Sequence, residues 1–354
     1  MKILDRYIAR AVILWTGVAL LVLMSLRLFA HFVDESGETG TGDFGVLDAL
    51  LVTLLKAPGF MMEVFPVAAL LGGLLALGGM ARHAELTAMR AAGVSIWRIL
   101  GSVMLAGAGL VILVVMLSEF VAPAAEQKAE LFRAERMNQP SILHTRHGYW
   151  LRDGNMFVNI RKVFGGGELG SIFIYELDDD WRLKTMTVAR EGGYENGEWV
   201  LRRVTQSQVS PEGITTRWWR EWVSPLSLKP AFLDLVSVAP DVMSAFDIWQ
   251  YLDFLAANEQ SRPEYEVALW NKVAIPVNTL ILLVLAVAFV LGNLRNVDIG
   301  QRILAGAVTG TVFVMLNRAA AFTALVYEVP PVLAAWAPAL AFLAITLFYL
   351  RRLR

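Results

Sequence analysis

The stretch ELTAMRAAGVSIWRIL (residues 85–100) lies between two long apolar runs, LLGGLLALGGMAR (70–82) and GSVMLAGAGLVILVVML (101–117). A helix of about 20 apolar residues is long enough to cross a bilayer. The stretch between the runs is too polar to do so, because charged residues such as Glu85 and Arg90 interrupt its apolar positions. The pattern predicts two membrane-spanning helices that are joined by a short amphipathic helix.

The composition is that of an integral membrane protein. Hydrophobic residues make up 56% of the 354 residues and charged residues only 18%, whereas about 25% of the residues in soluble domains are charged. Stretches long enough to span a bilayer lie near residues 10–33, 50–80, 97–121, 268–292, 301–326 and 332–350. The second contains Pro58 and Pro66, so we expect it to tilt or kink. The first is too long for a cleavable signal peptide and is followed by no small-residue cleavage site.

Lysines and arginines near the span ends predict the orientation, because cytoplasmic loops are enriched in these residues. They occur in the N-terminal tail, in the loops 82–98 and 292–302, and in the C-terminal tail. Segment 34–49, by contrast, holds five acidic residues and no lysine or arginine. We therefore expect both termini to be cytoplasmic and the long segment 122–266 to lie outside.

The long outer segment has the pattern of a β domain. SIFIYEL (171–177) is rich in β-branched and aromatic residues, and Asn196-Gly197 is a strong signal for a two-residue hairpin turn. Short strands separated by turns at this spacing predict a single all-β sandwich or jelly roll. Segment 245–260 is more helical in pattern and is expected to lead back to the membrane.

The predicted architecture is an α-helical membrane protein with six transmembrane helices and an all-β, jelly-roll-like domain inserted between helices 3 and 4. Residues 1–122 hold the first three transmembrane helices, residues 123–265 the β domain with its connecting helices, and residues 266–354 the last three. The net charge of −1 indicates no nucleic-acid partner. The absence of cysteine excludes disulfides, thiolate metal sites and cysteine nucleophiles.

The polar stretch between the second and third spans has one apolar face. Leu86, Met89, Gly93, Ile96 and Leu100 fall on this face at helical spacing. Such a helix either lies flat on the membrane or docks into a groove of another protein. Periodicity does not separate these two interpretations.

Charged residues also fall within the first two spans. Arg27, His31 and Asp34 share one helical face near the outer end, and a charge in lipid costs about 2.5–3.5 kcal/mol on insertion scales. Arg27 either reaches the headgroups or pairs with Asp34, or else Arg27 and His31 bind the phosphates of an amphiphile. Lys56 and Glu63 are expected to satisfy one another through neighbouring helices, and we predict no substrate role for them.

The fifth span and the segment after the third span hold further candidates. Phe313, Leu316 and Ala320 form an apolar face, for which packing between helices is the simpler explanation. Arg133 and Arg136 form a basic cluster beyond the third span, which either receives headgroups or is paired with glutamates about one turn away.

Several motifs together carry a resemblance to a known family. They are LDRYI (4–8), FVDE (32–35), AEL and MRAAGVS (within 84–95), EFVAP (119–123), EQKAELFRAERM (126–137), DGNMFVNI (153–160), ALWNK (268–272) and LGNLRNVDIGQRI (291–303). In this order they resemble the LptF/LptG permeases, which belong to the ABC transporter that exports lipopolysaccharide. LDRYI and FVD are more similar to the LptG branch of that family.

The resemblance implies that residues 82–95 form a coupling helix that docks into a partner ATPase. Glu85 matches the acidic residue of the family at this contact, and Leu86, Met89 and Arg90 are its neighbours in the motif. The chain has no GxxxxGK[ST] phosphate loop. We therefore expect no directly bound cofactor, with ATP and magnesium used by an LptB-like ATPase dimer, and a transporter subunit that is not itself an enzyme.

The resemblance also implies a lipid site. The first and fifth spans are expected to form the gates of a central cavity, in which Phe313, Leu316 and Ala320 contact acyl chains. The residues expected to bind lipid phosphates are Arg27, His31, Arg133, Arg136 and Arg318. This chain departs from the family at His31, Ser36 and Gly37, where LptG proteins commonly have lysines.

The expected assembly is a heterodimer with an LptF-like permease in the bacterial inner membrane, with its β domain in the periplasm. An LptC-like protein with one membrane span and a periplasmic bridge would receive the lipopolysaccharide. Two other functions remain open, a membrane scaffold without transport activity and an enzyme that modifies lipid headgroups. The enzyme needs a nucleophile or metal site, and the isolated pair His144 and His147 lacks a third ligand for zinc.

Overall fold

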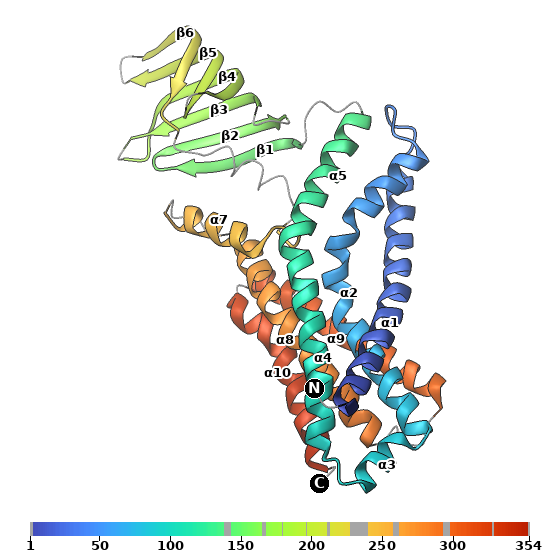
Figure 1. Cartoon of the computed structure of the whole chain (residues 1–354). Coiled ribbons are helices and arrows are strands. Elements are labelled where there is room, and N and C mark those ends of the chain that lie inside the picture. Colours follow the sequence, from blue (N-terminus) through green and yellow to red (C-terminus); the bar gives the residue numbers. More distant parts are fainter. Residues whose placement is uncertain are drawn as a thin grey trace.

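The computed structural model describes residues 3–137, 143–164, 168–178, 180–195, 197–210, 213–226, 240–257, 262–292, 298–327 and 329–352. A long bundle of helices carries a β sheet at one end (Figure 1). Both chain termini and the short helix α3 lie at the opposite end of the bundle. We call these two ends the sheet end and the α3 end.

Among the described residues, six helical segments are long and apolar enough to cross a membrane, as the sequence predicts. They are α1 (Ile3–Ser36), α2 (Val46–Arg82), a rod made of α4 (Ile96–Met116), η1 (Leu117–Val121) and α5 (Ala122–Arg136), then α8 (Pro263–Leu291), α9 (Ile299–Tyr327) and α10 (Pro331–Arg352). The helix α2 continues through Pro58 and Pro66. The predicted third span, 97–121, is only the first part of the rod, because the π-helical turn η1 passes the chain into the polar helix α5 without a break.

The helices pack most closely near the α3 end. The core there includes Leu70 and Leu77 of α2, Ile99 of α4 and Leu282 of α8, all at most 1% exposed. A Cβ atom on Gly72 would lie 2.4 Å from the Thr16 Cα atom of α1. Small residues allow such close approach between helices in a membrane, where dispersion contacts replace the hydrophobic effect as the driving force.

The polar stretch after α2 forms two helices rather than one. The helix α3 (Glu85–Ala91) ends after seven residues, and Gly93 has a φ of +84°, which favours glycine. Ser95 then caps α4 by accepting a hydrogen bond from the Arg98 backbone N–H at 3.3 Å. The apolar face predicted for residues 86 to 100 is therefore divided between α3 and α4.

Within its described residues, the inserted domain forms a six-stranded antiparallel sheet in the order β1-β2-β3-β4-β5-β6. The strands are β1 (Leu143–Asp153), β2 (Met156–Val163), β3 (Leu169–Leu177), β4 (Leu183–Glu195), β5 (Glu198–Ser210) and β6 (Gly213–Ser224). The predicted turn at 196–197 is confirmed, because Glu195 pairs with Glu198 across β4 and β5. The described strands follow one another as a meander, since short hairpins join neighbours, and they show none of the crossovers that a jelly roll requires.

One face of the sheet carries its own apolar core. Ile160, Ile172, Trp199 and Leu201 are fully buried there, and Phe254 of α7 (Ala245–Ala257) packs against this cluster. The predicted helix at 245–260 is thus confirmed up to Ala257. Figure 1 shows α7 between the sheet and the bundle, so α7 links the two parts of the molecule.

Candidate functional site

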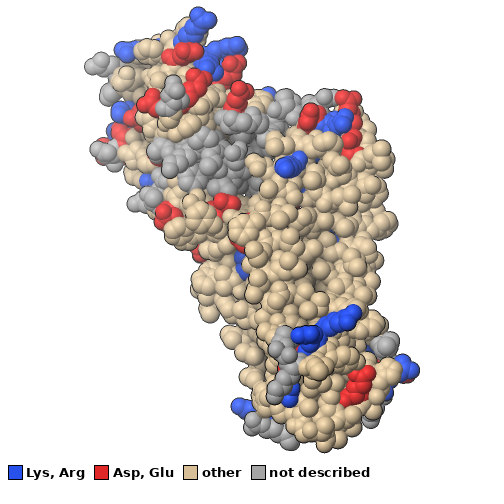
Figure 2. Space-filling model, in the orientation of Figure 1, with Lys and Arg blue, Asp and Glu red and all other residues tan. Residues whose placement is uncertain are grey.

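Charged residues gather at both ends of the bundle. Figure 2 shows a broad belt of mostly uncharged surface between them. At the sheet end, the four arginines predicted to bind phosphate belong to ion pairs, whereas His31 has no ionic partner among the described pairs. At the α3 end, the predicted coupling residues lie on α3.

Arg133 and Arg136 on α5 pair with acidic residues at the end of α1, in the loop that follows it and at the start of α2. The Arg133 guanidinium pairs with Glu35 at 2.8 Å and with Glu38. Arg136 pairs with Asp48 of α2 at 3.6 Å. The partner expected one turn away, Glu130, is only a distant third partner of Arg133 at 3.9 Å. The basic cluster therefore fastens α5 to α1 and α2 rather than forming a separate solvated face.

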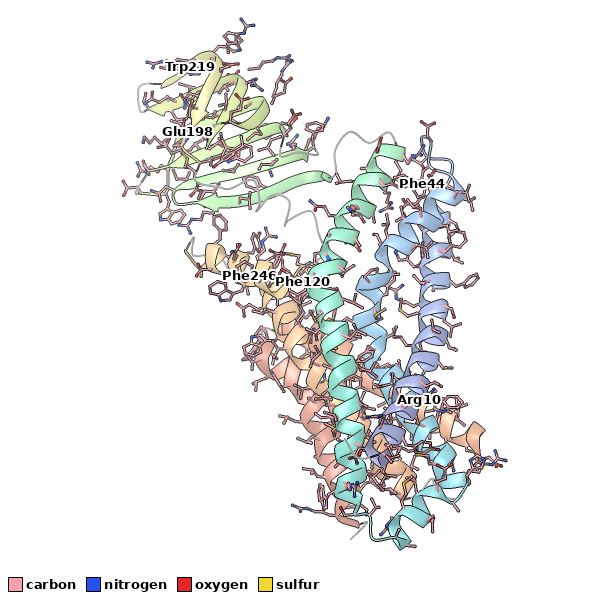
Figure 3. All side chains as sticks on the ribbon, viewed as in Figure 1. Arg10, Phe44, Phe120, Glu198, Trp219 and Phe246 are labelled. Carbon is pink, nitrogen blue, oxygen red and sulfur yellow. The ribbon has the colours of Figure 1, made fainter. Side chains whose placement is uncertain are left out.

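A cluster of buried apolar side chains accompanies these ion pairs. Phe44, in the loop between α1 and α2, is 1% exposed and packs with Ala129 and Met137 of the α5 segment. Figure 3 labels Phe44 at this tip of the bundle. The Asp43 backbone N–H also donates to the Arg136 carbonyl oxygen at 2.8 Å. The acidic loop is thus held against α5 by both packing and hydrogen bonds.

Lys56 and Glu63 do not form the mutual pair that the sequence suggested. The Lys56 Nζ atom lies 3.1 Å from Glu126 and 2.5 Å from Glu130, both on α5. Only 11% of the Lys56 side chain is exposed, so this contact joins α2 to α5 within the bundle. Glu63 has a different set of partners.

Glu63 of α2 holds two arginines at once. Its Oε2 atom lies 3.2 Å from the Arg27 Nε atom of α1, and its Oε1 atom pairs with Arg318 of α9. Arg27 therefore pairs with Glu63 rather than with Asp34. The Arg27 guanidinium also lies 3.9 Å from the centre of the Phe60 ring, a favourable cation–π contact.

His31 lies on the same face of α1 as Arg27. Its Nδ1 atom is 3.4 Å from the Thr53 hydroxyl of α2, and its ring packs against Phe60 with centroids 4.9 Å apart. Lys56 and Arg27 are both close enough to act on it electrostatically. The structure thus places Arg27 and His31, the two predicted phosphate-binding residues of the first span, near each other. Lys56 and Glu63 of α2 also lie near this pair.

The three apolar candidates of α9 have different surroundings. Phe313 is 3% exposed and meets Phe342 of α10 edge to face at 5.3 Å, so it takes part in helix packing. Ala320 packs beside a small cluster of α8, α9 and α10 residues. Leu316 is 44% exposed. Only Leu316 presents a large side chain to the outside of the chain, and contact with acyl chains stays a prediction for all three.

Sequence reasoning also missed a buried ion pair on α8. Lys272 of α8, whose side chain is 5% exposed, pairs with Glu119 of η1 at 3.0 Å. Glu119 also accepts a hydrogen bond from the Ala245 backbone N–H at 2.6 Å, at the start of α7. Both residues lie in the quoted motifs EFVAP and ALWNK, at the ends of two predicted spans. Their position at span ends was the available signal, but their pairing depends on the three-dimensional packing of the rod against α8.

Of the predicted coupling residues on α3, some pack on the bundle and one is exposed. Leu86 is 4% exposed, and with the partly buried Met89 it packs on the bundle core. Glu85 accepts a hydrogen bond from the Tyr7 hydroxyl of α1 at 2.9 Å, and Arg90 is exposed. Figure 3 labels Arg10 of α1 at this same end. Leu86 and Met89 therefore fasten α3 to the bundle, and Arg90 is left toward solvent.

A cavity of about 350 Å³ opens beside α3. It is lined by residues of α2, α3 and the end of α8, namely Ala81, Leu86, Thr87, Arg90, Ala91, Val290 and Leu291. Among the described residues, no group of three histidine, aspartate or glutamate side chains is placed to hold a metal ion. The side chains of His144 and His147 lie outside the described part of the chain.

These features define a class of protein, a multi-span membrane protein whose helices are joined by ion pairs at the sheet end and whose opposite end carries a short helix packed on the bundle. The family described as lipopolysaccharide export system permease LptF/LptG matches residues 6–352. The permease protein LptG of Escherichia coli K12 is 35% identical over 99% of this chain and 98% of its own length. LptG of Haemophilus influenzae is 33% identical over 99% of each chain. The chain belongs to the LptF/LptG family.

Proposed function

We propose that the chain is the LptG-type permease subunit of a lipopolysaccharide exporter, which takes the lipid from the outer leaflet of the inner membrane. The match to LptG proteins along nearly the whole chain supports this function. The observation that carries the lipid site is the meeting of Arg27 and Arg318, from the first and fifth spans, at one carboxylate. Two guanidinium groups beside an apolar surface suit an amphiphile that carries phosphate groups.

The α3 end is the cytoplasmic side in this proposal. Both termini lie there with α3 (Figure 1), together with arginines in the first turns of α1 and α4 and at the end of α2. The enrichment of arginine at these ends supports a cytoplasmic position, and the acidic segment after α1 then lies in the periplasm beside the sheet.

The lipid phosphates bind Arg27 and Arg318 first and the outer pair, Arg133 and Arg136, later. His31 contributes a neutral or charged imidazole depending on pH, and Arg27 supplies the fixed charge one turn away. Acyl chains lie against α1 and α9, where exposed apolar side chains such as Leu316 continue the surface. An LptF-like second permease would close the other side of this cavity.

The α3 end receives force from an LptB-like ATPase dimer. Arg90 and the cavity beside it are open to a partner, whereas Leu86 and Met89 connect α3 to the core. A displacement of α3 is therefore passed into α2 and α8 by packed side chains, which resist deformation. Export then follows when the cavity alternates between two states with different affinities for lipid.

The sheet passes the lipid onward to an LptC-like protein and a periplasmic bridge. The experiment that tests the whole proposal is reconstitution of this chain in proteoliposomes with its LptF-like and LptB-like partners. We expect lipopolysaccharide to stimulate ATP hydrolysis and ATP to release lipopolysaccharide to the soluble bridge protein. A complex without lipid-dependent ATPase activity would favour the scaffold, and covalent change of the lipid would favour the enzyme.

A further inference from the structure

Glu63 is a single carboxylate shared by two guanidinium groups from different helices. Its two oxygen atoms each take one arginine, Arg27 from α1 and Arg318 from α9. Both α1 and α9 pack against α2, the helix that carries Glu63. The carboxylate therefore ties the first and the fifth spans together through the second.

The charges in this group do not balance. Two guanidinium groups carry two positive charges and Glu63 carries one negative charge, so one positive charge remains for a further anion. Elsewhere at the sheet end the opposite holds, since Lys56 faces two carboxylates and Arg133 is paired with Glu35 and Glu38. Of these three groups, the one around Glu63 is the one with an excess of positive charge.

The pairs of Glu63 are also open to competition. The exposed fractions of the side chains are 32% for Arg27, 37% for Glu63 and 73% for Arg318. The chain therefore leaves part of each side chain uncovered, and an anion can approach the two guanidinium groups from that side. The buried pair of Lys272 with Glu119, in which the lysine side chain is only 5% exposed, lacks this access for an anion.

We propose that Glu63 is an internal counter-ion that a phosphate group of the lipid displaces from Arg27 and Arg318. This inference rests on the proposed function and adds a residue that sets the affinity of the site. A phosphate monoester carries about −1.5 to −2 charges at pH 7 and has three acceptor oxygens. It therefore binds two guanidinium groups more strongly than a single carboxylate does. Displacement frees α1 from α9, and return of Glu63 to the arginines expels the phosphate.

The carboxylate thus keeps the affinity low enough for release. Without it, the phosphate would have no competitor, and the lipid would remain bound after the cavity is compressed. Asp241 is a second acidic group near Glu63. Desolvation, and then repulsion from Glu63, raise the pKa of Asp241, and the charge of Lys272 opposes this shift. A raised pKa favours the neutral form of Asp241, so Glu63 remains the carboxylate that competes with the phosphate for the two arginines.

The test compares two lipid probes on the intact permease–ATPase complex in nanodiscs. The probes are lipid A with both phosphates and the same lipid A after enzymatic removal of the phosphates. In Glu63→Gln the affinity for the phosphorylated probe should rise about fivefold, which corresponds to about 1 kcal/mol. The affinity for the dephosphorylated probe should stay unchanged, and ATP-driven release of the phosphorylated probe should become slower.

Asp5→Asn is the matched control. Asp5 forms a comparable ion pair between α1 and α4, with Arg98 at 3.5 Å, but at the α3 end of the bundle. This variant should bind both probes as the unmodified chain does. If Glu63→Gln fails to assemble, Glu63→Asp reports the same competition, because its shorter side chain holds the arginines less well and should also raise the affinity for the phosphorylated probe.

The outcomes separate this inference from the function on which it rests. Unchanged or lower affinity of Glu63→Gln for the phosphorylated probe would show that Glu63 is only a structural tie, and the export function would stand. Equal affinity of the unmodified complex for both probes would overturn the phosphate site itself, and the counter-ion role with it.

Discussion

The two ends of the helical bundle differ in the contacts that predominate between their helices. At the sheet end, ion pairs such as Lys56 with Glu126 and Lys272 with Glu119 join one helix to another. At the α3 end, fully buried apolar side chains such as Leu70, Leu77 and Ile99 fill the space between helices. Ion pairs can exchange partners with a bound anion, whereas close-packed side chains cannot separate without opening a cavity. In the proposed function the sheet end is the outer end and the α3 end is the inner end. The difference then suits an outer end that opens for a charged lipid and an inner end that moves as one body.

The largest expected effect tests the inner end as a receiver of force. We expect Glu85→Lys to abolish ATP-driven export while leaving the chain folded, because it reverses a charge at the proposed ATPase contact and affects one exposed hydrogen bond, with Tyr7. The measurement is lipopolysaccharide release from proteoliposomes, with thermal unfolding as the check on folding. Tyr7→Phe is the control that removes only the hydrogen bond, and its export should stay near normal. Normal export by Glu85→Lys would remove this residue from the coupling contact.

The next effect tests whether ion pairs hold the outer end. Lys272→Met should lower the free energy of unfolding by about 3–5 kcal/mol, because it leaves Glu119 largely buried without its lysine. Thermal unfolding in detergent measures the loss. The double variant Glu119→Gln/Lys272→Met should recover most of it, since no uncompensated charge remains. A double variant as unstable as the single one would mean that packing, and not charge, accounts for the site.

A third test addresses the close packing nearer the inner end. Gly72→Ala places a Cβ atom 2.4 Å from the Thr16 Cα atom, and we expect it to destabilise the chain by about 1–3 kcal/mol. Gly79→Ala in the same helix is the matched control, because nothing lies within 4 Å of its added Cβ atom. The control should be neutral or slightly stabilising, since alanine favours a helix. Equal unfolding temperatures for the two variants would contradict close packing of α1 on α2.

The sequence predicted the elements of this fold better than their contacts. Apolar runs located all six spans, and the turn at 196–197 predicted the β4–β5 hairpin, because both signals are local. Gly93 is a local signal for the break between α3 and α4. The helical periodicity of residues 86 to 100 does not reveal the positive φ at Gly93, so it wrongly placed Leu100 on the same helix face as Leu86.

The candidate site was predictable only as a list of residue types. Arg27 was selected because a charge within an apolar run is costly, and Arg318 because of the family resemblance, yet their common partner Glu63 was expected to pair with Lys56. Glu63 and Lys56 lie seven residues apart on α2, a spacing that allows no direct contact on one helix. Their true partners lie on α1, α5 and α9, and only the packing of those helices against α2 selects them.

The smallest expected effect tests whether the outer arginines act singly or together. Arg27→Ala removes one of two guanidinium groups at Glu63 and should lower export several-fold rather than abolish it, because Arg318 remains to bind phosphate. Lipopolysaccharide release under limiting lipid measures the change, and Arg27→Lys is the control that keeps the charge but loses the bidentate geometry. Export equal to that of the unmodified chain would show that Arg27 serves only to neutralise Glu63. A complete loss would instead show that the two arginines bind the phosphate as one unit, so that neither guanidinium group is sufficient alone.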